Sequence, residues 1–190
     1  MTTLLLVDDN AAFLRLYGKL LELIGFDVIG APGEEECMHI LASERPDLVL
    51  LDIMMEPRDG WDTLRSIRNN EPTRDLPVMI LTGKRPTVGE IDRYGGDIED
   101  YLMKPVRKSE LKEILEHTLE RICQRAARIE TACDSGCSPS DIAEYVRLER
   151  AVRMDEKFRG LFVEINGEQE EQVRQRRKTL DTMKEQLNIR

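Results

Sequence analysis

The chain has 190 residues, of which 41% are hydrophobic and 34% charged, and its formal net charge is −9. This length and apolar fraction suit one globular domain of ordinary size with a small addition, which excludes a fully disordered chain and argues against two large domains. No stretch approaches the ~20 consecutive apolar residues that a bilayer span needs. We therefore expect neither a membrane protein nor a secreted precursor.

Charge is distributed unevenly along the chain. Residues 1–119 contain 14 Lys and Arg against 23 Asp and Glu, whereas residues 120–190 contain 14 of each kind. Such a shift in composition indicates two units with different roles. The acidic first unit argues against nucleic acid as its direct ligand, because phosphate backbones attract basic surfaces. It is compatible with a bound cation.

The four cysteines are expected to be reduced thiols of a cytoplasmic protein, because nothing in the sequence marks export. Cys133 and Cys137 lie four residues apart, but no second cysteine pair or neighbouring histidine completes a zinc set. We therefore expect no zinc site there.

The first 120 residues alternate short apolar runs, typical of buried strands, with stretches of helical periodicity. The predicted strands are residues 4–7, 27–31, 48–51, 78–82 and 101–103. The predicted helices are a first one capped by Asn10 and ended by Gly25, a second over 34–43, a third around 61–67, a short or irregular fourth within 83–96, and a fifth capped by Ser109. Five strands alternating with five helices predict an α/β fold, a doubly wound parallel sheet with helices on both faces.

Polar side chains follow four of the five predicted strands. Asp8 and Asp9 end the first strand, Asp52 the third, Thr82 the fourth and Lys104 the fifth. In open parallel sheets, ligands bind at the carboxyl ends of the strands. The sequence therefore predicts one functional site at this edge of the sheet.

Three neighbouring carboxylates repel one another, so a positive charge must lie among them. An oxygen-rich site without histidine suits Mg²⁺, which uses one or two carboxylates and keeps several waters. We expect Asp9 to bind the metal directly and Asp8 to bind through a water or as a second ligand. Asp52 and the backbone carbonyl near Met54 complete the expected set.

The remaining groups are those that stabilise a transferring phosphoryl group. The carboxylate of Asp52 is the expected nucleophile, which would form an aspartyl phosphate. The hydroxyl of Thr82 and the ammonium of Lys104 would each donate to a phosphoryl oxygen.

These residues resemble the receiver domain of two-component response regulators over residues 3–120, and are similar to the single-domain chemotaxis regulator. The matching features are Asp8-Asp9, Asp52, Asp59-Gly60, Thr82, Tyr101 and Lys104-Pro105. The resemblance implies phosphotransfer to Asp52 from a histidine kinase or phosphotransfer protein, with magnesium obligatory. It implies a phosphoacceptor that catalyses only its own phosphorylation and slow dephosphorylation. It also implies a switch through Thr82 and Tyr101, and a cis Lys104–Pro105 peptide bond.

The sequence departs from the family pattern near the acceptor aspartate. Pro57 lies one residue later than usual, and Gly83 replaces the alanine that is common after the switch threonine. Met54 and Lys84 occupy positions where the family tunes dephosphorylation. Because an apolar Met54 cannot orient a water, we expect slow self-hydrolysis of the phosphoryl group.

The second unit is predicted to be helical. We expect a receiver over residues 1–121 and a helical extension over 122–190 for dimerisation or partner binding. The fifth helix continues to a break at 134–136, Ser138 begins the next helix, and a final helix follows from Glu168. These helices are too sparsely apolar to fold alone, so we expect a partner helix or a second copy, with a homodimer on phosphorylation.

The sequence leaves two alternatives open. The cluster Arg174, Arg176, Arg177 and Lys178 is the strongest indication of DNA binding, although a solvated helix face explains it more simply. The first alternative is therefore a transcription regulator whose C-terminal helices bind DNA. The second is a receiver that acts as a phosphate sink.

Overall fold

The computed structural model describes residues 2–134, 136–159 and 167–189. It contains two compact units, each built from two segments of the chain. We call Met1–Arg85 with Glu99–Leu119 the sheet unit, and Pro86–Ile98 with Glu120–Arg190 the helical unit. The chain therefore passes between the units three times.

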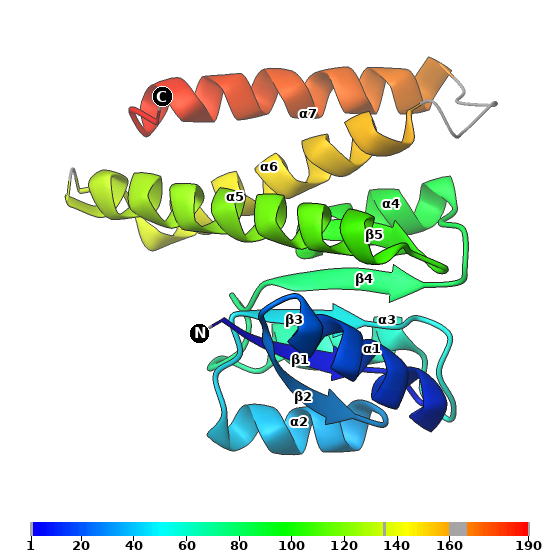
Figure 1. Cartoon of the computed structure of the whole chain (residues 1–190). Helices are drawn as coiled ribbons and strands as arrows, with labels where there is room; N and C mark the ends of the chain where they lie inside the picture. Colours follow the sequence, from blue (N-terminus) through cyan, green and yellow to red (C-terminus); the bar gives the residue numbers. More distant parts are fainter. Residues whose placement is uncertain (1, 135, 160–166, 190) are drawn as a thin grey trace. The chain divides into compact units, whose positions relative to one another are not determined.

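The sheet unit contains a five-stranded parallel sheet with the strand order β2-β1-β3-β4-β5 (Figure 1). The strands are β1 (Thr3–Val7), β2 (Asp27–Ala31), β3 (Leu48–Leu51), β4 (Val78–Thr82) and β5 (Asp100–Met103). The predicted strands are confirmed to within one residue at their ends. The apolar runs of β1, β3 and β4 are buried almost completely, as expected for strands covered on both faces.

The strand register determines which polar residues meet. Val7 is paired with Leu51, so Asp8 and Asp52 leave neighbouring strands at the same level. Thr82 is paired with Met103, the residue before Lys104. The predicted convergence of these side chains therefore follows from the register of β1, β3, β4 and β5.

Helices on both faces of the sheet complete this unit (Figure 1). They are α1 (Ala11–Leu23), α2 (Glu34–Ser43), α3 (Gly60–Asn69) and the first part of α5 (Lys108–Asp134). The side chain of Asn10 accepts hydrogen bonds from two N–H groups of the first turn of α1, which confirms the predicted cap. The predicted cap at Ser109 is wrong. The N–H of Leu111 donates to the carbonyl of Arg107, so Ser109 lies inside the first turn of α5.

The helical unit contains the short helix α4 (Val88–Tyr94), the 3-10 turn η1 (Gly95–Asp97), the rest of α5, α6 (Pro139–Phe158) and α7 (Gly167–Gln186). The predicted short fourth helix and the cap of α6 by Ser138 are confirmed. One cluster of buried apolar side chains joins α5, α6, α7 and the turn after α7: Ala132, Tyr145, Val152, Leu180, Met183, Leu187 and Ile189. These helices therefore find their partners within the same chain.

The turn η1 packs closely against α6. A Cβ atom on Gly96 would lie 2.6 Å from Cγ of Arg147, and one on Gly95 would lie 3.3 Å from Cβ of Met154. Two glycines in succession thus allow α6 to approach the backbone of η1.

No helix in the described part of the chain is long and apolar enough to cross a membrane.

Candidate phosphoacceptor site

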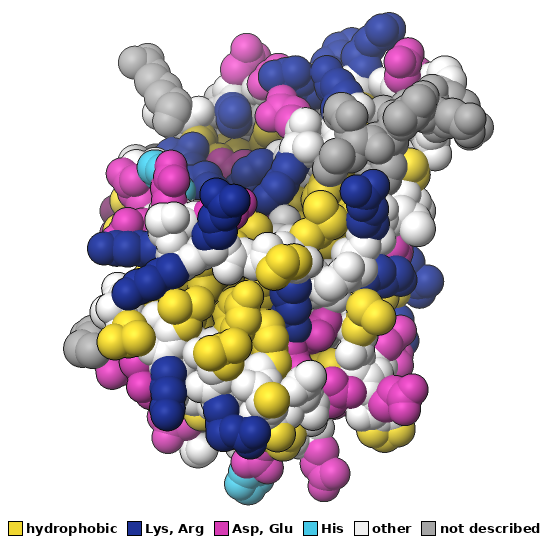
Figure 2. All heavy atoms as spheres, turned by 45° about the vertical axis from the view of Figure 1, so that its right-hand side comes forward, with side chains coloured by type: hydrophobic (Ala, Val, Ile, Leu, Met, Phe, Trp, Pro, Cys, Tyr) yellow, Lys and Arg dark blue, Asp and Glu magenta, His cyan; other side chains and the backbone are white. Residues whose placement is uncertain are grey.

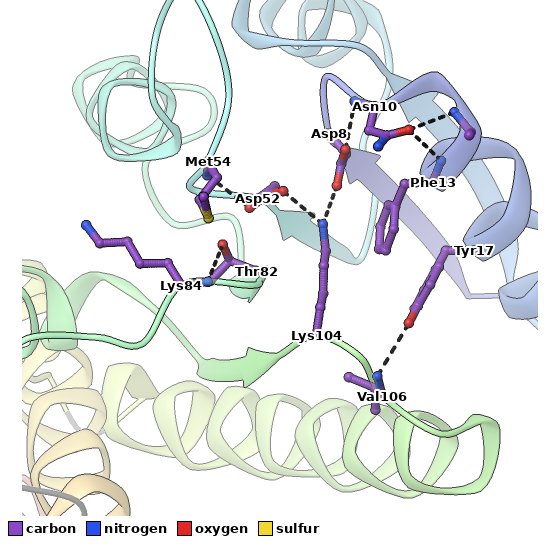
Figure 3. Close-up of polar contacts among 11 residues, drawn as sticks. Asp8, Asn10, Phe13, Tyr17, Asp52, Met54, Thr82, Lys84, Lys104 and Val106 are labelled. Atoms are coloured by element: carbon purple, nitrogen blue, oxygen red, sulfur yellow. Dashed lines mark hydrogen bonds and ion pairs between the residues drawn. The ribbon is translucent and has the colours of Figure 1, made fainter.

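The ammonium group of Lys104 lies between two carboxylates at the carboxyl end of the sheet (Figure 3). Its Nζ atom is 2.8 Å from Oδ2 of Asp52 and also contacts Oδ2 of Asp8. The backbone N–H of Lys104 donates to the carbonyl of Thr82 at 2.7 Å, which continues the pairing of β4 with β5. The structure therefore brings together residues from three strand ends that were predicted to share one site.

The two carboxylates differ in their preference for the proton. Burial raises the pKa of Asp8, and the nearby charge of Asp52 adds to this, while the hydrogen bond from Lys104 opposes it. Burial alone would also raise the pKa of Asp52, but hydrogen bonds from Lys104, Thr82 and the Met54 N–H outweigh it and hold that pKa below its ordinary value. Asp52 is therefore ionised at neutral pH, as a nucleophilic carboxylate must be.

Of the other residues predicted to hold a metal, Met54 contacts Asp52 and Asp9 contacts the loop that follows Asp52. The N–H of Met54 donates to Oδ1 of Asp52 at 3.0 Å, and the N–H of Glu56 donates to Oδ2 of Asp9 at 3.0 Å. Within the described ranges, no three His, Cys, Asp or Glu side chains already converge as a metal site. The donors nevertheless fit Mg²⁺ in kind, because they are carboxylate and carbonyl oxygens.

The predicted switch residues lie on β4 and β5 of the same unit. Thr82 is completely buried, and its Oγ1 accepts a 3.4 Å hydrogen bond from the N–H of Lys84. Tyr101 is 2% exposed, and its hydroxyl donates to the carbonyl of Lys84 at 2.8 Å. The ring of Tyr101 is therefore turned inward in this structure. Lys84 and the exposed Met54 lie on the side of Asp52 away from Lys104 in Figure 3.

The Asp59-Gly60 pair supports the loop that carries Asp52. The side chain of Asp59 caps α3 by accepting the N–H of Asp62 at 2.8 Å. A Cβ on Gly60 would lie 2.0 Å from the carbonyl oxygen of Asp52, so only glycine fits. The peptide bonds before Pro57 and Pro105 are both cis, the second as expected.

An aromatic pair beside Lys104 was not predicted as part of the site. The Nζ atom lies 3.5 Å from the ring centroid of Phe13, which stacks on Tyr17 with centroids 4.0 Å apart. Both residues lie within the predicted first helix, between Asn10 and Gly25. Their i, i+4 spacing directly after Asp8-Asp9 was the available signal, but nothing local indicated the contact with Lys104.

The basic cluster on α7 is largely neutralised by neighbouring acids. Arg174 pairs with Glu171 at 3.2 Å, and Arg177 pairs with Glu156 at 2.8 Å. Arg176 pairs with Asp155 at 3.0 Å and with Asp92 at 3.1 Å. Figure 2 shows Lys and Arg side chains interspersed with Asp and Glu over the face in view. This arrangement agrees with the simpler interpretation of the cluster as a charged helix face.

Comparison with known proteins assigns the sheet unit to a family. The model of the response regulator receiver domain matches residues 4–116. The chain belongs to the response regulator receiver domain family of two-component systems. Members of this family are phosphoacceptor signalling proteins rather than classical enzymes.

Particular relatives agree with this assignment. The chain is 38% identical over 124 residues to the transcriptional regulatory protein CpxR of Escherichia coli. The aligned region covers 64% of this chain and 50% of CpxR. It is 30% identical over 119 residues to the phosphate regulon regulator PhoB of Pseudomonas aeruginosa, covering 63% of this chain and 52% of PhoB. The chain thus matches about half the length of these curated relatives.

Solved structures show the same fold. The N-terminal domain of a response regulator receiver protein from Methanoculleus marisnigri is 46% identical, with a TM-score of 0.54 over 62% of this chain and 95% of that one. The receiver domain of a sensor histidine kinase from Pseudomonas aeruginosa is 27% identical, with a TM-score of 0.55 over 63% of this chain and 98% of that one. That second structure is described with a magnesium ion in its active-site cleft.

Proposed function

We propose that Asp52 accepts a phosphoryl group from a histidine kinase or phosphotransfer protein. The observation that carries this proposal is the ammonium of Lys104 held between Asp8 and Asp52 at the carboxyl end of the sheet. An Asp52 carboxylate oxygen forms the new bond to phosphorus while the P–N bond of the phosphohistidine breaks. The bonding electron pair leaves with the imidazole nitrogen. Lys104 and Thr82 then donate hydrogen bonds to the phosphoryl oxygens.

Magnesium is the cofactor that this donor set would bind. Asp8, Asp9, Asp52 and the carbonyl of Met54 would hold it. When bound, the ion supplies positive charge to the phosphoryl oxygens. The chain's own contribution is a fixed ammonium and an ionised acceptor carboxylate, whose low pKa is favoured by the hydrogen bonds that it accepts.

The signal would pass to the helical unit through a shared segment. The chain leaves β4 at Thr82, enters the helical unit at Pro86–Ile98 and returns as β5, which carries Tyr101. Thr82 and Tyr101 therefore lie on the two strands that flank the segment Pro86–Ile98, and this segment packs against α6. A change in the position of either residue would reach α6 through this segment. This supports a phosphoacceptor domain over 1–121 that acts on a helical interaction module over 122–190, and it argues against a simple phosphate sink. We further propose a cytoplasmic protein that forms a homodimer on phosphorylation.

The acceptor assignment is tested by intact-mass measurement of the full chain after incubation with phosphoramidate and Mg²⁺. We expect the mass of one phosphoryl group on the wild-type chain, and none on Asp52→Asn or when Mg²⁺ is chelated. Equal labelling of Asp52→Asn would overturn the proposal.

Slow loss of the phosphoryl group is the second part of the proposal. The side chain of Met54 is 60% exposed and apolar, so it has no group that orients an attacking water. Met54→Asn places an amide at that point and is expected to accelerate phosphate release several-fold. Release followed after removal of the phosphodonor tests this, and an unchanged rate would remove Met54 from the explanation.

DNA binding by the helical unit is a second candidate, because relatives such as CpxR and PhoB are named transcriptional regulators. The ion pairs of Arg174, Arg176 and Arg177 argue against it. Retention on DNA that falls steeply with salt would support this candidate over the protein-interaction module.

A further inference from the structure

The side chain of Lys104 lies across the face of an aromatic ring as it reaches the acceptor carboxylates (Figure 3). Its Nζ atom is 3.5 Å from the ring centroid of Phe13, within the range of a cation–π interaction. The Lys104 side chain is 16% exposed, and Phe13 is half-buried outside the buried core. The ring therefore does more than fill the interior. It covers the Lys104 ammonium group, which also contacts the carboxylates of Asp8 and Asp52.

Both the backbone and the ring of Phe13 have fixed partners. Its backbone N–H donates to Oδ1 of Asn10 at 3.1 Å, which places it in the first turn of α1. Its face stacks on Tyr17 at an interplanar angle of 20°, and the Tyr17 hydroxyl accepts the N–H of Val106 at 3.4 Å. Val106 lies two residues after Lys104. The aromatic pair thus connects the start of α1 with the loop that carries the lysine.

The chemistry of the contact suits a lysine that must later bind a phosphoryl oxygen. An ammonium group has three N–H donors, and in this structure Asp8 and Asp52 accept from it. A carboxylate or amide in place of Phe13 would compete for a further N–H. A ring face attracts the charge through its quadrupole and does so without a lone pair that would compete as strongly.

We propose that Phe13 is a positioning residue for phosphorylation, which holds the Lys104 ammonium at the point where it meets the phosphoryl oxygens. This inference rests on the proposed phosphoacceptor function of Asp52. Phe13 does not touch the reacting atoms, so it acts through Lys104. Leucine at this position would retain apolar volume but lose the attraction for the charge.

The test compares Phe13→Leu with Phe13→Tyr in the full chain, because tyrosine keeps the ring and leucine does not. The first measurement is the NMR chemical shift of the Lys104 ε-methylene protons, which a ring current moves upfield in the wild-type chain. The second is the rate of Asp52 phosphorylation by phosphoramidate with Mg²⁺. Thermal unfolding shows that each variant is folded, and Phe13→Met replaces Phe13→Leu if the latter is not.

We expect Phe13→Leu to lose the upfield shift and to be phosphorylated about 2- to 30-fold more slowly, the range that a cation–π contact spans. Phe13→Tyr should retain both the shift and a rate close to that of the wild type. A wild-type chain without the upfield shift would overturn the proposal. So would a folded Phe13→Leu chain that reacts at the wild-type rate, or a folded Phe13→Tyr chain as slow as Phe13→Leu.

The two proposals fail in distinguishable ways. If the wild-type chain is never phosphorylated, the phosphoacceptor function fails and the role of Phe13 fails with it, even where the ring current is present. If the wild-type chain is phosphorylated on Asp52 but the ringless variants are equally fast, only the role of Phe13 fails.

Discussion

Arg176 of α7 donates from Nη1 to both carboxylate oxygens of Asp155 on α6, each at 3.0 Å. Its other terminal nitrogen, Nη2, donates to Asp92 of α4 at 3.1 Å. The Asp155 side chain is 4% exposed, whereas Arg176 retains partial access to solvent. One guanidinium group thus joins α4, α6 and α7 within the helical unit, and it is the main compensation for a buried carboxylate.

Arg176→Ala should destabilise the helical unit by about 2 kcal/mol at pH 7, less than for a fully buried pair because the arginine is partly exposed. Burial raises the pKa of Asp155, with the charge of Asp92 adding to it and Arg176 opposing it. Without Arg176 the ionised carboxylate becomes still less favourable. The destabilisation caused by Arg176→Ala should therefore become smaller as the pH falls towards 3.8, the ordinary pKa of an aspartate, because Asp155 becomes protonated.

Urea unfolding and hydrogen exchange of α6 peptides measure this effect. Arg174→Ala is the matched control, because its pair with Glu171 is exposed and should contribute little. Asp155→Asn combined with Arg176→Ala should recover part of the loss. An Arg176→Ala chain as stable as Arg174→Ala would show that the Arg176 contacts do not stabilise the unit.

Gly96→Ala tests the close packing of η1 against α6. The added Cβ would lie 2.6 Å from Cγ and 3.0 Å from the backbone oxygen of Arg147, so the turn or the helix must shift. We expect a destabilisation of about 1–3 kcal/mol and faster hydrogen exchange in α6. Gly89→Ala in α4 is the control, since its Cβ meets nothing within 4 Å and alanine favours helix. Equal behaviour of the two variants would contradict the packing described for η1.

Asp8→Asn should stabilise the metal-free chain at pH 7 by on the order of 1 kcal/mol. The pKa of Asp8 is raised above its ordinary value of 3.8, chiefly by burial, so folding favours the protonated form. The free energy of unfolding of the wild-type chain should therefore decrease as the pH rises from 3.8 through the raised pKa of Asp8. The amide of Asp8→Asn does not titrate, so the variant lacks this decrease.

The difference in unfolding free energy between Asp8→Asn and the wild-type chain should accordingly vanish near pH 3 and reach its full size at neutral pH. Saturating Mg²⁺ should narrow it, because the wild-type chain gains binding free energy that the variant partly loses. Urea unfolding across this pH range provides the measurement. A variant less stable than the wild type at pH 7 without Mg²⁺ would show that the contact with Lys104 outweighs burial at Asp8.

Much of the sheet unit could be predicted because its signals are local. Continuous apolar runs such as Leu48–Leu51 occur where a strand is covered on both faces, and each run ends directly before a functional residue. The parallel topology then brings Asp8, Asp52 and Lys104 to one edge, whatever the details of packing.

The features that were missed depend on contacts between distant parts of the chain. Gly95 and Gly96 lie at the end of the segment predicted as a short or irregular helix, and only the tertiary structure shows that their lack of side chains lets α6 pack closely. Phe13 and Lys104 meet through the register of the sheet and the start of α1, so neither segment alone indicates the contact. The start of α5 was misplaced by two residues because Ser109 is a good cap in sequence, whereas the backbone hydrogen bonds begin at Arg107.

The most direct test of the phosphoacceptor assignment locates the phosphoryl group on the chain. The full-length protein is treated with phosphoramidate and Mg²⁺, the acyl phosphate is reduced with borohydride, and peptides are sequenced by mass spectrometry. We predict homoserine at position 52 and at no other aspartate, with the signal lost when the phosphorylated protein is left to hydrolyse first. Homoserine at Asp8 or Asp9, or none in the peptide that contains Asp52, would contradict the assignment.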